Sequence, residues 1–261
     1  MSTLFDLTGK VAVITGSSKG IGRAIAERMA EHGAKVVVSS RKQAACEAVA
    51  EAIAARGGEA WVRTCNINRK EDLQALVDVT LGHWGGIDVL VCNAAVNPYY
   101  GPSLQVPDDA YDRIMNSNVR SNLWLCNMVL PQMAARGGGA AIIVSSIGGL
   151  RGSVNLPVYA LSKAADMQLA RNLACEWGPK NIRVNCIAPG LVRTDFARAL
   201  WENPDLYRRR TRETPLMRIG EPDEIAGAAI FLAAEAGRFV TGQTLVIDGG
   251  VTIGSPALPP D

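Results

Sequence analysis

The sequence predicts a single-domain α/β fold, in which helices cover both faces of a doubly wound parallel sheet. Two observations predict it. Short apolar runs rich in valine and isoleucine alternate along the chain with longer segments of helical period, as expected of buried strands and the helices that connect them. No shift in composition marks a domain boundary, and 261 residues are enough to bury a sizeable core in one unit.

Six runs have the composition of buried parallel strands. After the first of them, apolar residues recur from Ile21 to Met29 at helical spacing, and His32-Gly33 provides a stop, which completes one strand–helix–strand unit. The predicted strands are Val11–Thr15, Lys35–Ser39, Ile87–Val91, Ala141–Ser145, Arg183–Ile187 and Thr244–Ile247. The other predicted helices are Gln43–Ala55, Glu71–His83, Asp109–Ala135, Val158–Trp177 and Glu221–Ala234.

Three segments depart from this alternation. Residues 136–140, RGGGA, predict a tight turn, and the long insertion Thr194–Pro215 is typical of a lid or binding loop, here a substrate loop. Its basic run at 208–212 could attract an anionic substrate, but a solvated helix face is the favoured interpretation. The proline-rich residues 254–261 predict a flexible tail.

Composition excludes several classes of function. The chain has 27 Lys+Arg against 25 Asp+Glu, a net charge of +2, which disfavours a nucleic-acid binder. Two separated histidines and six cysteines without a C-x-x-C pair predict no metal site. No run approaches the ~18–20 apolar residues that span a bilayer, so no membrane partner is expected. The first residues carry no basic segment followed by an apolar core, and we expect a cytoplasmic protein with free thiols.

A glycine-rich turn follows the first strand and opens directly into a helix. Glycines allow positive φ and a close approach of pyrophosphate, and the helix N-terminus offers unpaired N–H groups. The spacing is G-x-x-x-G-x-G, and a plain turn with small residues is the alternative, but its place between strand and helix favours a dinucleotide site. The predicted cofactor residues here are Gly16, Ser18, Lys19, Gly20, Ile21 and Gly22.

The end of the second strand indicates which dinucleotide is preferred. An acidic residue there would hold a ribose 2′-hydroxyl, whereas this chain has Ser39-Ser40-Arg41-Lys42. Arg41 can grip a phosphate, Ser40 can donate a hydroxyl, and Lys19 is expected to point toward the same corner. The sequence therefore favours NADP(H), with NAD(H) possible. An unpartnered surface arginine is the weaker interpretation of Arg41.

A tyrosine and a lysine lie four residues apart in the predicted helix that begins at 158. Tyr159 and Lys163 would lie on one helix face. Such a pair is usually no more than helix surface. A pair of hydroxyls, Ser145 and Ser146, ends the preceding strand and could reach the same pocket, which favours chemistry over chance.

Together these segments resemble the short-chain dehydrogenase/reductase family over nearly the whole chain, and the resemblance implies a single Rossmann-like domain over 1–261. TGSSKGIG at 15–22 looks like the family's cofactor signature, and TGQTLVIDGG at 241–250 resembles its oligomer-forming end, which implies a homotetramer. Ser146 lies thirteen positions before Tyr159, the family's usual interval, which favours it over Ser145. The positions that match the family's catalytic residues are Asn118, Ser146, Tyr159 and Lys163. Those that match its remaining cofactor contacts are Asn66, Ile67, Asn93, Pro189, Gly190, Val192 and Thr194, with Tyr159 and Lys163.

Some positions depart from the family pattern. Cys92 and Ala95 stand where asparagine and glycine are usual, and Asn66-Ile67 replaces Asp-Val beside the adenine, where asparagine can still hydrogen bond. NAAVNP, IVSSI and SSRK look closest to the NADPH-dependent carbonyl (retinal) reductase branch. The peroxisomal tripeptide of that branch is absent, so its chemistry is carried over and its location is not.

The resemblance implies a role for each catalytic group. Hydride arriving at a carbonyl carbon leaves negative charge on the oxygen, which needs a proton and oriented donors. Tyr159 would supply the proton, with phenolate favoured by the Lys163 ammonium and by the oxidised nicotinamide. Ser146 would orient the substrate oxygen. Lys163 would also bond the nicotinamide ribose, and Asn118 would hold the lysine through a water.

The substrate depends on three loops that look largely apolar, Val96–Gly101, Ile147–Leu156 and Thr194–Pro215. They suit a small hydrophobic ketone or aldehyde, so the predicted function is hydride transfer between NADP(H) and a carbonyl or secondary alcohol. One alternative is a 3-oxoacyl-thioester reductase of the acyl-carrier-protein type, for which Arg171 could help to dock the carrier. Another is a dinucleotide-binding sensor or scaffold, which would be expected to lack one of the four catalytic groups.

Overall fold

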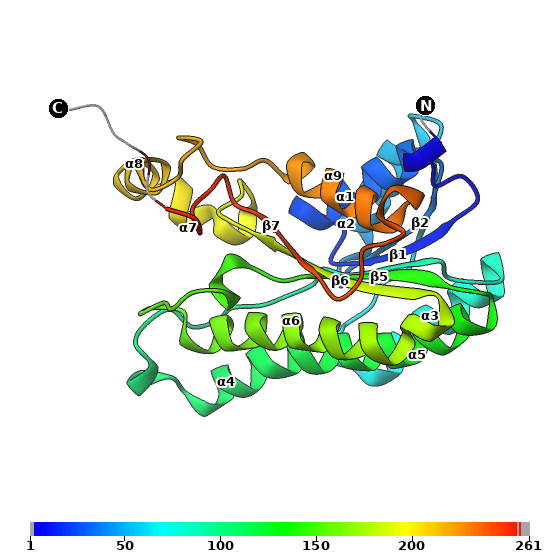
Figure 1. Cartoon of the computed structure of the whole chain (residues 1–261), viewed down its shortest axis with the longest axis horizontal. Helices are drawn as coiled ribbons and strands as arrows, with labels where there is room; N and C mark the ends of the chain where they lie inside the picture. The colour runs from blue at the N-terminus through cyan, green and yellow to red at the C-terminus, as the bar shows by residue number, and fades with distance from the viewer. Residues whose placement is uncertain (1–2, 255, 257–261) are drawn as a thin grey trace.

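The computed structural model describes residues 3–254 and residue 256, and its centre is a seven-stranded parallel sheet (Figure 1). The strand order is β3-β2-β1-β4-β5-β6-β7, and every neighbouring pair is parallel. The strands are β1 (Val11–Thr15), β2 (Lys35–Ser39), β3 (Glu59–Val62), β4 (Val89–Cys92), β5 (Gly139–Val144), β6 (Ile182–Pro189) and β7 (Thr244–Ile247). The predicted doubly wound α/β fold is confirmed.

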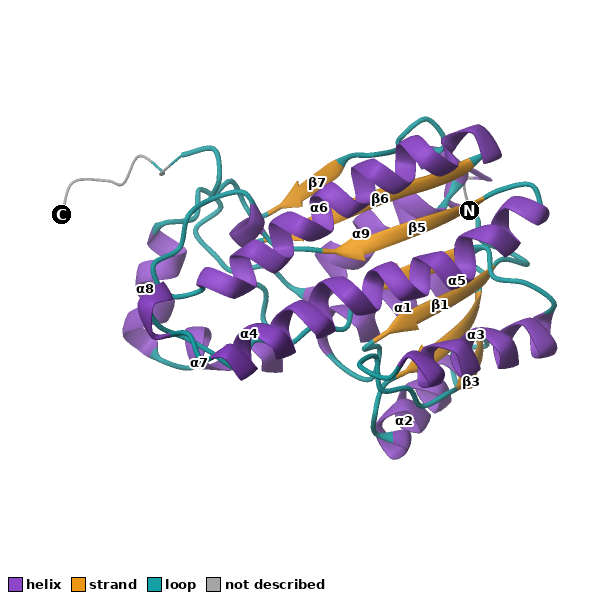
Figure 2. Cartoon of the chain, turned by 90° about the horizontal axis from the view of Figure 1, so that it is seen from below, coloured by secondary structure: helices purple, strands orange, loops and turns teal. Residues whose placement is uncertain are grey.

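Helices cover both faces of the sheet. The helices α1, α2 and α9 lie on one face, and α3, α5 and α6 lie on the other, with α4 against α6 (Figures 1 and 2). The helices are α1 (Gly20–Glu31), α2 (Gln43–Ala54), α3 (Lys70–Trp84), α4 (Asp108–Met115), α5 (Ser121–Ala135), α6 (Pro157–Trp177), α7 (Arg198–Trp201), α8 (Pro204–Arg212) and α9 (Pro222–Ala233). No helix in the part of the chain that the structure describes is long and apolar enough to cross a bilayer.

The central strands are apolar at successive positions because both of their faces are buried. In β1, Ala12 and Ile14 pack into the core beneath α1, α2 and α9, whereas Val13 packs into the core beneath α3, α5 and α6. In β2, Val36 and Val37 divide in the same way. Side chains alternate between the faces of a strand, so one continuous apolar run serves two cores.

Two elements differ from the prediction. The structure contains a further strand, β3, at the edge of the sheet, where its side chains are only partly buried or exposed and the run EAWV is short and mixed. The single helix predicted over Asp109–Ala135 is divided into α4 and α5 by one turn of π-helix at Asn116–Arg120. A π turn inserts an extra residue without interrupting the helix, which apolar periodicity does not reveal.

The insertion after β6 folds into short helices, namely a 3₁₀ turn at Asp195–Ala197 followed by α7 and α8. The basic run at 208–212 lies on α8 and is solvated, as expected: Arg209 and Arg210 pair with Glu213 at 2.9 and 3.0 Å. Of the predicted tail at 254–261, residues 255 and 257–261 lie outside the described residues.

Strand order sets the place of the site. The chain runs outward from β1 to β3, then returns to the other side of β1 and continues from β4 to β7. Such a reversal leaves a crevice outside the carboxyl ends of the two central strands, where ligands of open α/β sheets bind.

Candidate active site

The predicted site residues come together at the carboxyl ends of four strands. The glycine turn follows β1, Asn93 follows β4, Ser146 follows β5 closely, and Pro189-Gly190 stands at the end of β6. Because β1, β4, β5 and β6 are parallel neighbours, these segments meet along one edge of the sheet.

The glycine turn has the backbone that its sequence predicts. Gly16 has φ +67° and Gly20 has φ +56°, conformations that side chains disfavour. Gly20 begins α1, and its cap residue, Lys19, makes no side-chain hydrogen bond to the helix. The first N–H groups of α1 therefore remain available to an anion at the positive end of the helix dipole.

Asn93 fastens the turn to the loop after β4. Its side-chain amide donates to the carbonyl oxygens of Thr15 and Gly16 at 3.0 and 3.2 Å, and its backbone N–H donates to the Thr15 hydroxyl. Gly22 packs closely against the Asn93 side chain and the Gly16 carbonyl. A Cβ at position 22 would overlap the Asn93 amide and lie 2.5 Å from the Gly16 carbonyl oxygen. The turn closes only with glycine at position 22.

Gly22→Ala is expected to destabilise the fold by about 1–3 kcal/mol, the usual cost of overpacking, and to weaken binding of the predicted dinucleotide at least about tenfold because the turn must move. Thermal unfolding and fluorescence titration with NADPH measure both effects. Gly82→Ala is the matched control, since Gly82 lies in α3 with open space around its Cβ position. Wild-type stability and NADPH affinity in Gly22→Ala would show that the close approach has no consequence.

The end of β2 carries the residues predicted to choose the cofactor. Arg41 is exposed and forms no ion pair with any described residue, and the Ser40 hydroxyl contacts the Cys46 thiol at 3.1 Å. The Lys19 Nζ lies 3.4 Å from the Asp195 carboxylate, in the segment after β6. That Lys19 and Arg41 hold one phosphate stays a prediction.

A buried serine that sequence analysis did not single out joins the two strand ends. The Ser17 hydroxyl donates to the Ile14 carbonyl and accepts from the Ser39 backbone N–H, both at 2.8 Å. Asn66 and Ile67 lie next to this corner, since the Cys65 N–H donates to the Ser40 carbonyl at 3.0 Å. The predicted adenine and phosphate contacts therefore share one end of the crevice.

The segment after β6 is held against the sheet edge. The Gly190 N–H donates to the Ile247 carbonyl at 2.9 Å, and Val192 is buried and bridges to Gly220. The Thr194 hydroxyl accepts from the Ala197 N–H and caps the 3₁₀ turn that follows. These contacts fix the path from Pro189 to Thr194.

The two candidate serines have different partners. The Ser145 hydroxyl is buried and donates to the Lys163 carbonyl at 2.7 Å. Ser146 is only partly buried, and its hydroxyl oxygen accepts from the Gly148 N–H at 3.1 Å, which leaves its own proton free to donate. This difference favours Ser146 as the group that meets a substrate, in agreement with the spacing argument.

Tyr159 and Lys163 lie on one face of α6, with the Lys163 Nζ 5.8 Å from the centre of the tyrosine ring. Tyr159 is partly exposed, whereas Lys163 is buried to 2% exposure. The ammonium donates to the Val144 carbonyl at 2.9 Å and pairs with the Asp166 carboxylate at 3.0 Å. Asp166 was not anticipated from the sequence.

Asn118 lies in the π turn and is fully buried. Its amide donates to the Ser162 hydroxyl at 3.0 Å, and Ser162 in turn donates to the Tyr159 carbonyl at 2.7 Å. Its backbone carbonyl accepts from the Asn122 amide at 2.6 Å. The same Asn122 amide donates to Asp166, so the Asn122 and Asp166 side chains link the Asn118 backbone carbonyl to the Lys163 ammonium.

Three apolar loops are predicted to receive the substrate. The loop after β6 lies beside Tyr159, and the loops after β4 and β5 contact each other. The Phe196 ring lies 6.1 Å from the Tyr159 ring, centre to centre, which brings the insertion after β6 to the phenol. The loops after β4 and β5 are joined by Asn155, which accepts from the Gly101 N–H and donates to the Tyr100 hydroxyl. Tyr100, Val154 and Phe196 are all exposed.

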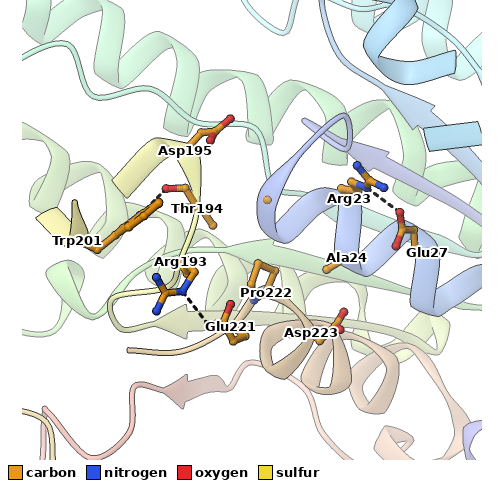
Figure 3. A pocket seen from close by; sticks show the side chains of 11 residues that line it. Arg23, Ala24, Glu27, Arg193, Thr194, Asp195, Trp201, Glu221, Pro222 and Asp223 are labelled. Carbon is orange, nitrogen blue, oxygen red and sulfur yellow. Dashed lines mark hydrogen bonds and ion pairs between the residues drawn. The ribbon is translucent and has the colours of Figure 1, made fainter. Parts of the chain in front are cut away.

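A separate cavity of about 500 Å³ lies between α1, the segment Arg193–Asp195 and the start of α9 (Figure 3). Gly20 and Thr194 line it, but none of the four predicted catalytic residues does. Arg193 on its wall pairs with Glu221 at 3.0 Å. The cavity therefore lies apart from the predicted catalytic residues. No cluster of three potential metal ligands occurs among the described residues, and all six cysteine thiols are free.

Comparisons with known proteins agree with this geometry. Residues 16–252 match the family model described as enoyl-(acyl carrier protein) reductase. The chain is 42% identical over 244 residues to dehydrogenase/reductase SDR family member 4 of Bos taurus, covering 94% of this chain and 88% of that protein.

Two solved structures have nearly the same fold. A 7α-hydroxysteroid dehydrogenase complexed with NADH and 7-oxo glycochenodeoxycholic acid aligns with TM-score 0.93 and 37% identity, covering 99% of each chain. A gluconate 5-dehydrogenase from Burkholderia cenocepacia, in complex with NADP and tartrate, aligns with TM-score 0.92 and 32% identity, covering 96% of this chain and 98% of that one.

Proposed function

The chain belongs to the short-chain dehydrogenase/reductase family, and from this premise we propose that it is an NADP(H)-dependent reductase of small hydrophobic carbonyl compounds. It is an oxidoreductase that uses a nicotinamide dinucleotide and acts on carbonyl or alcohol groups. The single observation that carries the proposal is the Tyr159–Lys163 pair near Ser146, whose hydroxyl and the Tyr159 ring both lie within 4 Å of the Cβ position at Gly148.

The residues at this edge fit a dinucleotide. Gly22 has no side chain, and a Cβ there would overlap the Asn93 amide that holds the turn. No side chain caps the N-terminus of α1, so its first N–H groups can bind the pyrophosphate. One solved neighbour carries NADH and another NADP, so the choice depends on residues of this chain. Exposed Arg41, with no acidic residue at the end of β2, supports a 2′-phosphate.

Each predicted catalytic residue has a task in carbonyl reduction. When bound, the dinucleotide supplies the hydride. Ser146 donates its free hydroxyl proton in a hydrogen bond to the substrate carbonyl oxygen and orients it, and Tyr159 delivers the phenolic proton to that oxygen as negative charge develops. The Lys163 ammonium beneath the ring stabilises the phenolate that remains. Asn118 holds the Tyr159 end of α6 through Ser162.

The substrate class follows from the side chains around Tyr159. The Phe196 ring lies beside the Tyr159 ring, and exposed Tyr100 and Val154 belong to the loops after β4 and β5. We therefore infer that Thr194–Pro215 is the substrate loop and that it favours an apolar ketone or aldehyde, whose burial contributes about 25 cal/mol per Å² of apolar surface.

A 3-oxoacyl-thioester reductase is the second candidate, favoured by the acyl-carrier-protein description of the matching family model. The same catalytic residues would serve it. Arg171, the predicted carrier contact, is exposed, and its guanidinium donates to Gln168 at 2.7 and 3.0 Å. This guanidinium would have to exchange that partner for an acidic carrier surface.

A substrate panel with both cofactors tests the proposal. We expect kcat/KM with NADPH to be highest for aromatic or other apolar ketones and aldehydes, and at least about tenfold lower for 3-oxoacyl thioesters, because the apolar loops select by buried surface. A preference for the thioesters would favour the second candidate. The absence of turnover with every carbonyl and alcohol would contradict the proposed function and favour a binding protein.

We propose a homotetramer in the cytoplasm. The side chains of β7 are only partly buried in one chain, and an aliphatic edge strand suits burial against a second copy. Six free thiols suit a reducing compartment. Sedimentation measures the assembly, and a monomer at micromolar concentration would contradict it.

A further inference from the structure

One carboxylate in the core has no role in the chemistry described so far. Asp166 lies three residues after Lys163 on α6, and its side chain is 0% exposed. Among the described residues, Lys163 and Asp166 are the only lysine, arginine, aspartate or glutamate side chains that are buried. Burying an unpaired charge is costly, so this pair calls for an explanation.

Both oxygens of the Asp166 carboxylate are used. Oδ2 accepts from the Lys163 ammonium at 3.0 Å, and Oδ1 accepts from the Asn122 amide at 3.0 Å. The ammonium also donates to the Val144 carbonyl at 2.9 Å. The carboxylate therefore determines both the charge and the direction of the Lys163 side chain.

Resting on the proposed function, we propose that Asp166 is a positioning residue, the counter-ion that holds Lys163 as a buried ammonium beneath the Tyr159 ring. A lysine desolvated to this degree, without a carboxylate beside it, would tend to lose its proton. Lys163 would then stabilise neither the phenolate nor the cofactor.

The other titratable groups around the pair do not replace Asp166. The hydrogen bond with Cys126 and burial raise the pKa of Cys92, and burial raises the pKa of Cys186, so these two thiols carry no charge. Arg171 is exposed and bonded to Gln168. Among the residues that the structure describes, Asp166 is thus the only carboxylate that pairs with Lys163, whose remaining titratable neighbour is Tyr159.

The pKa of Lys163 reflects this balance. Burial by itself lowers it, but attraction by Asp166 and Tyr159 and the hydrogen bond to Asp166 outweigh burial, so the pKa lies above its ordinary value. Burial raises the pKa of Asp166 more than Lys163 lowers it. Removing the carboxylate leaves burial dominant, and the pKa of Lys163 then falls below its ordinary value.

Asp166→Asn keeps the shape of the side chain and removes its charge. The effect is measured as the rate of alcohol oxidation with NADP⁺ from pH 6 to 10.5. We expect the wild type to keep its rate at alkaline pH. In the variant, the rate of alcohol oxidation should fall about tenfold per pH unit once the pH exceeds the lowered pKa of Lys163, because the lysine then loses its proton. Ser145→Ala, which removes a buried hydrogen bond to the Lys163 carbonyl without changing charge, should keep the wild-type profile.

Urea unfolding as a function of pH provides a readout that does not depend on turnover. In the wild type the pKa of Lys163 is raised in the folded state, so its ammonium stabilises the fold. This contribution to the free energy of unfolding is complete below about pH 10.4 and is lost as the pH rises above it. In Asp166→Asn the folded pKa is lowered, so the unfolded state binds more protons and stability rises with pH up to about 10.4. The stability gap between the two proteins should therefore narrow from pH 8 to 10.

Parallel rate profiles together with a constant stability gap would overturn the inference and leave Asp166 a packing residue. If the wild type oxidises no alcohol, the proposed function fails. The unfolding data would still test whether Asp166 is the counter-ion of Lys163. Should Asp166→Asn fail to fold, the folding of the double variant Lys163→Met/Asp166→Leu tests the inference instead. That variant buries no unpaired charge and should fold, and its failure to fold would also overturn the inference.

Discussion

Replacing Tyr159 by phenylalanine should lower kcat by about 10³-fold and leave the Kd for NADPH within about twofold of wild type. The substitution removes one hydroxyl and keeps the ring that packs beside Phe196 and above the Lys163 ammonium. Without the phenol, no side chain delivers a proton to the carbonyl oxygen as the hydride arrives. Single-turnover reduction of the best ketone and fluorescence titration with NADPH measure the two quantities.

Tyr111→Phe is the matched control, because Tyr111 lies exposed on α4 and its hydroxyl has no catalytic assignment. It should keep wild-type kcat. If Tyr159→Phe keeps wild-type turnover, the proton comes from another group and the assignment is wrong. Lost NADPH binding together with lost turnover would point to a structural role for the hydroxyl.

Replacing Arg41 by aspartate should shift the ratio of kcat/KM between NADPH and NADH by about 100-fold or more toward NADH. A charge-assisted hydrogen bond to phosphate contributes about 1.5–3 kcal/mol, and the new carboxylate repels the 2′-phosphate while accepting from a 2′-hydroxyl. Arg41 is exposed at the end of β2, so the substitution should leave stability nearly unchanged. Initial rates with the two cofactors at saturating ketone give the ratio.

Lys180→Asp makes the same change of charge at the opposite edge of the sheet, in the turn that leads into β6. Its cofactor ratio should equal that of the wild type, which separates a local contact from the effect of net charge. An unchanged ratio in Arg41→Asp would reject the proposed phosphate contact and make NAD(H) the expected cofactor.

Sequence patterns revealed those parts of the fold in which burial is complete. The run Val11–Thr15 is buried along its whole length, so its apolar composition and the glycine turn after it were sufficient to place β1 and α1. In β3, by contrast, no residue is fully buried, so β3 lacks the continuous apolar run that predicts a central strand. The π turn at Asn116–Arg120 was missed because it keeps the chain helical while shifting the register of the faces.

The site was predictable where chemistry depends on spacing along one helix, as for Tyr159 and Lys163. Asp166 was missed because a carboxylate three residues from a lysine usually belongs to a solvated helix face. Only the packing of α6 against α5 and the sheet buries it. Asn122 on α5 is its buried hydrogen-bond partner there, and a polar pair on two largely apolar helices is the signal that could have found it.

The position of the Tyr159 hydroxyl in a crystal structure with NADP⁺ and a ketone tests the central claim most directly. The account predicts that its oxygen lies about 2.6–3.2 Å from the carbonyl oxygen, with Ser146 on the same oxygen and the Lys163 ammonium beneath the ring. A phenol directed away from the bound ketone, with another proton donor in its place, would contradict the account.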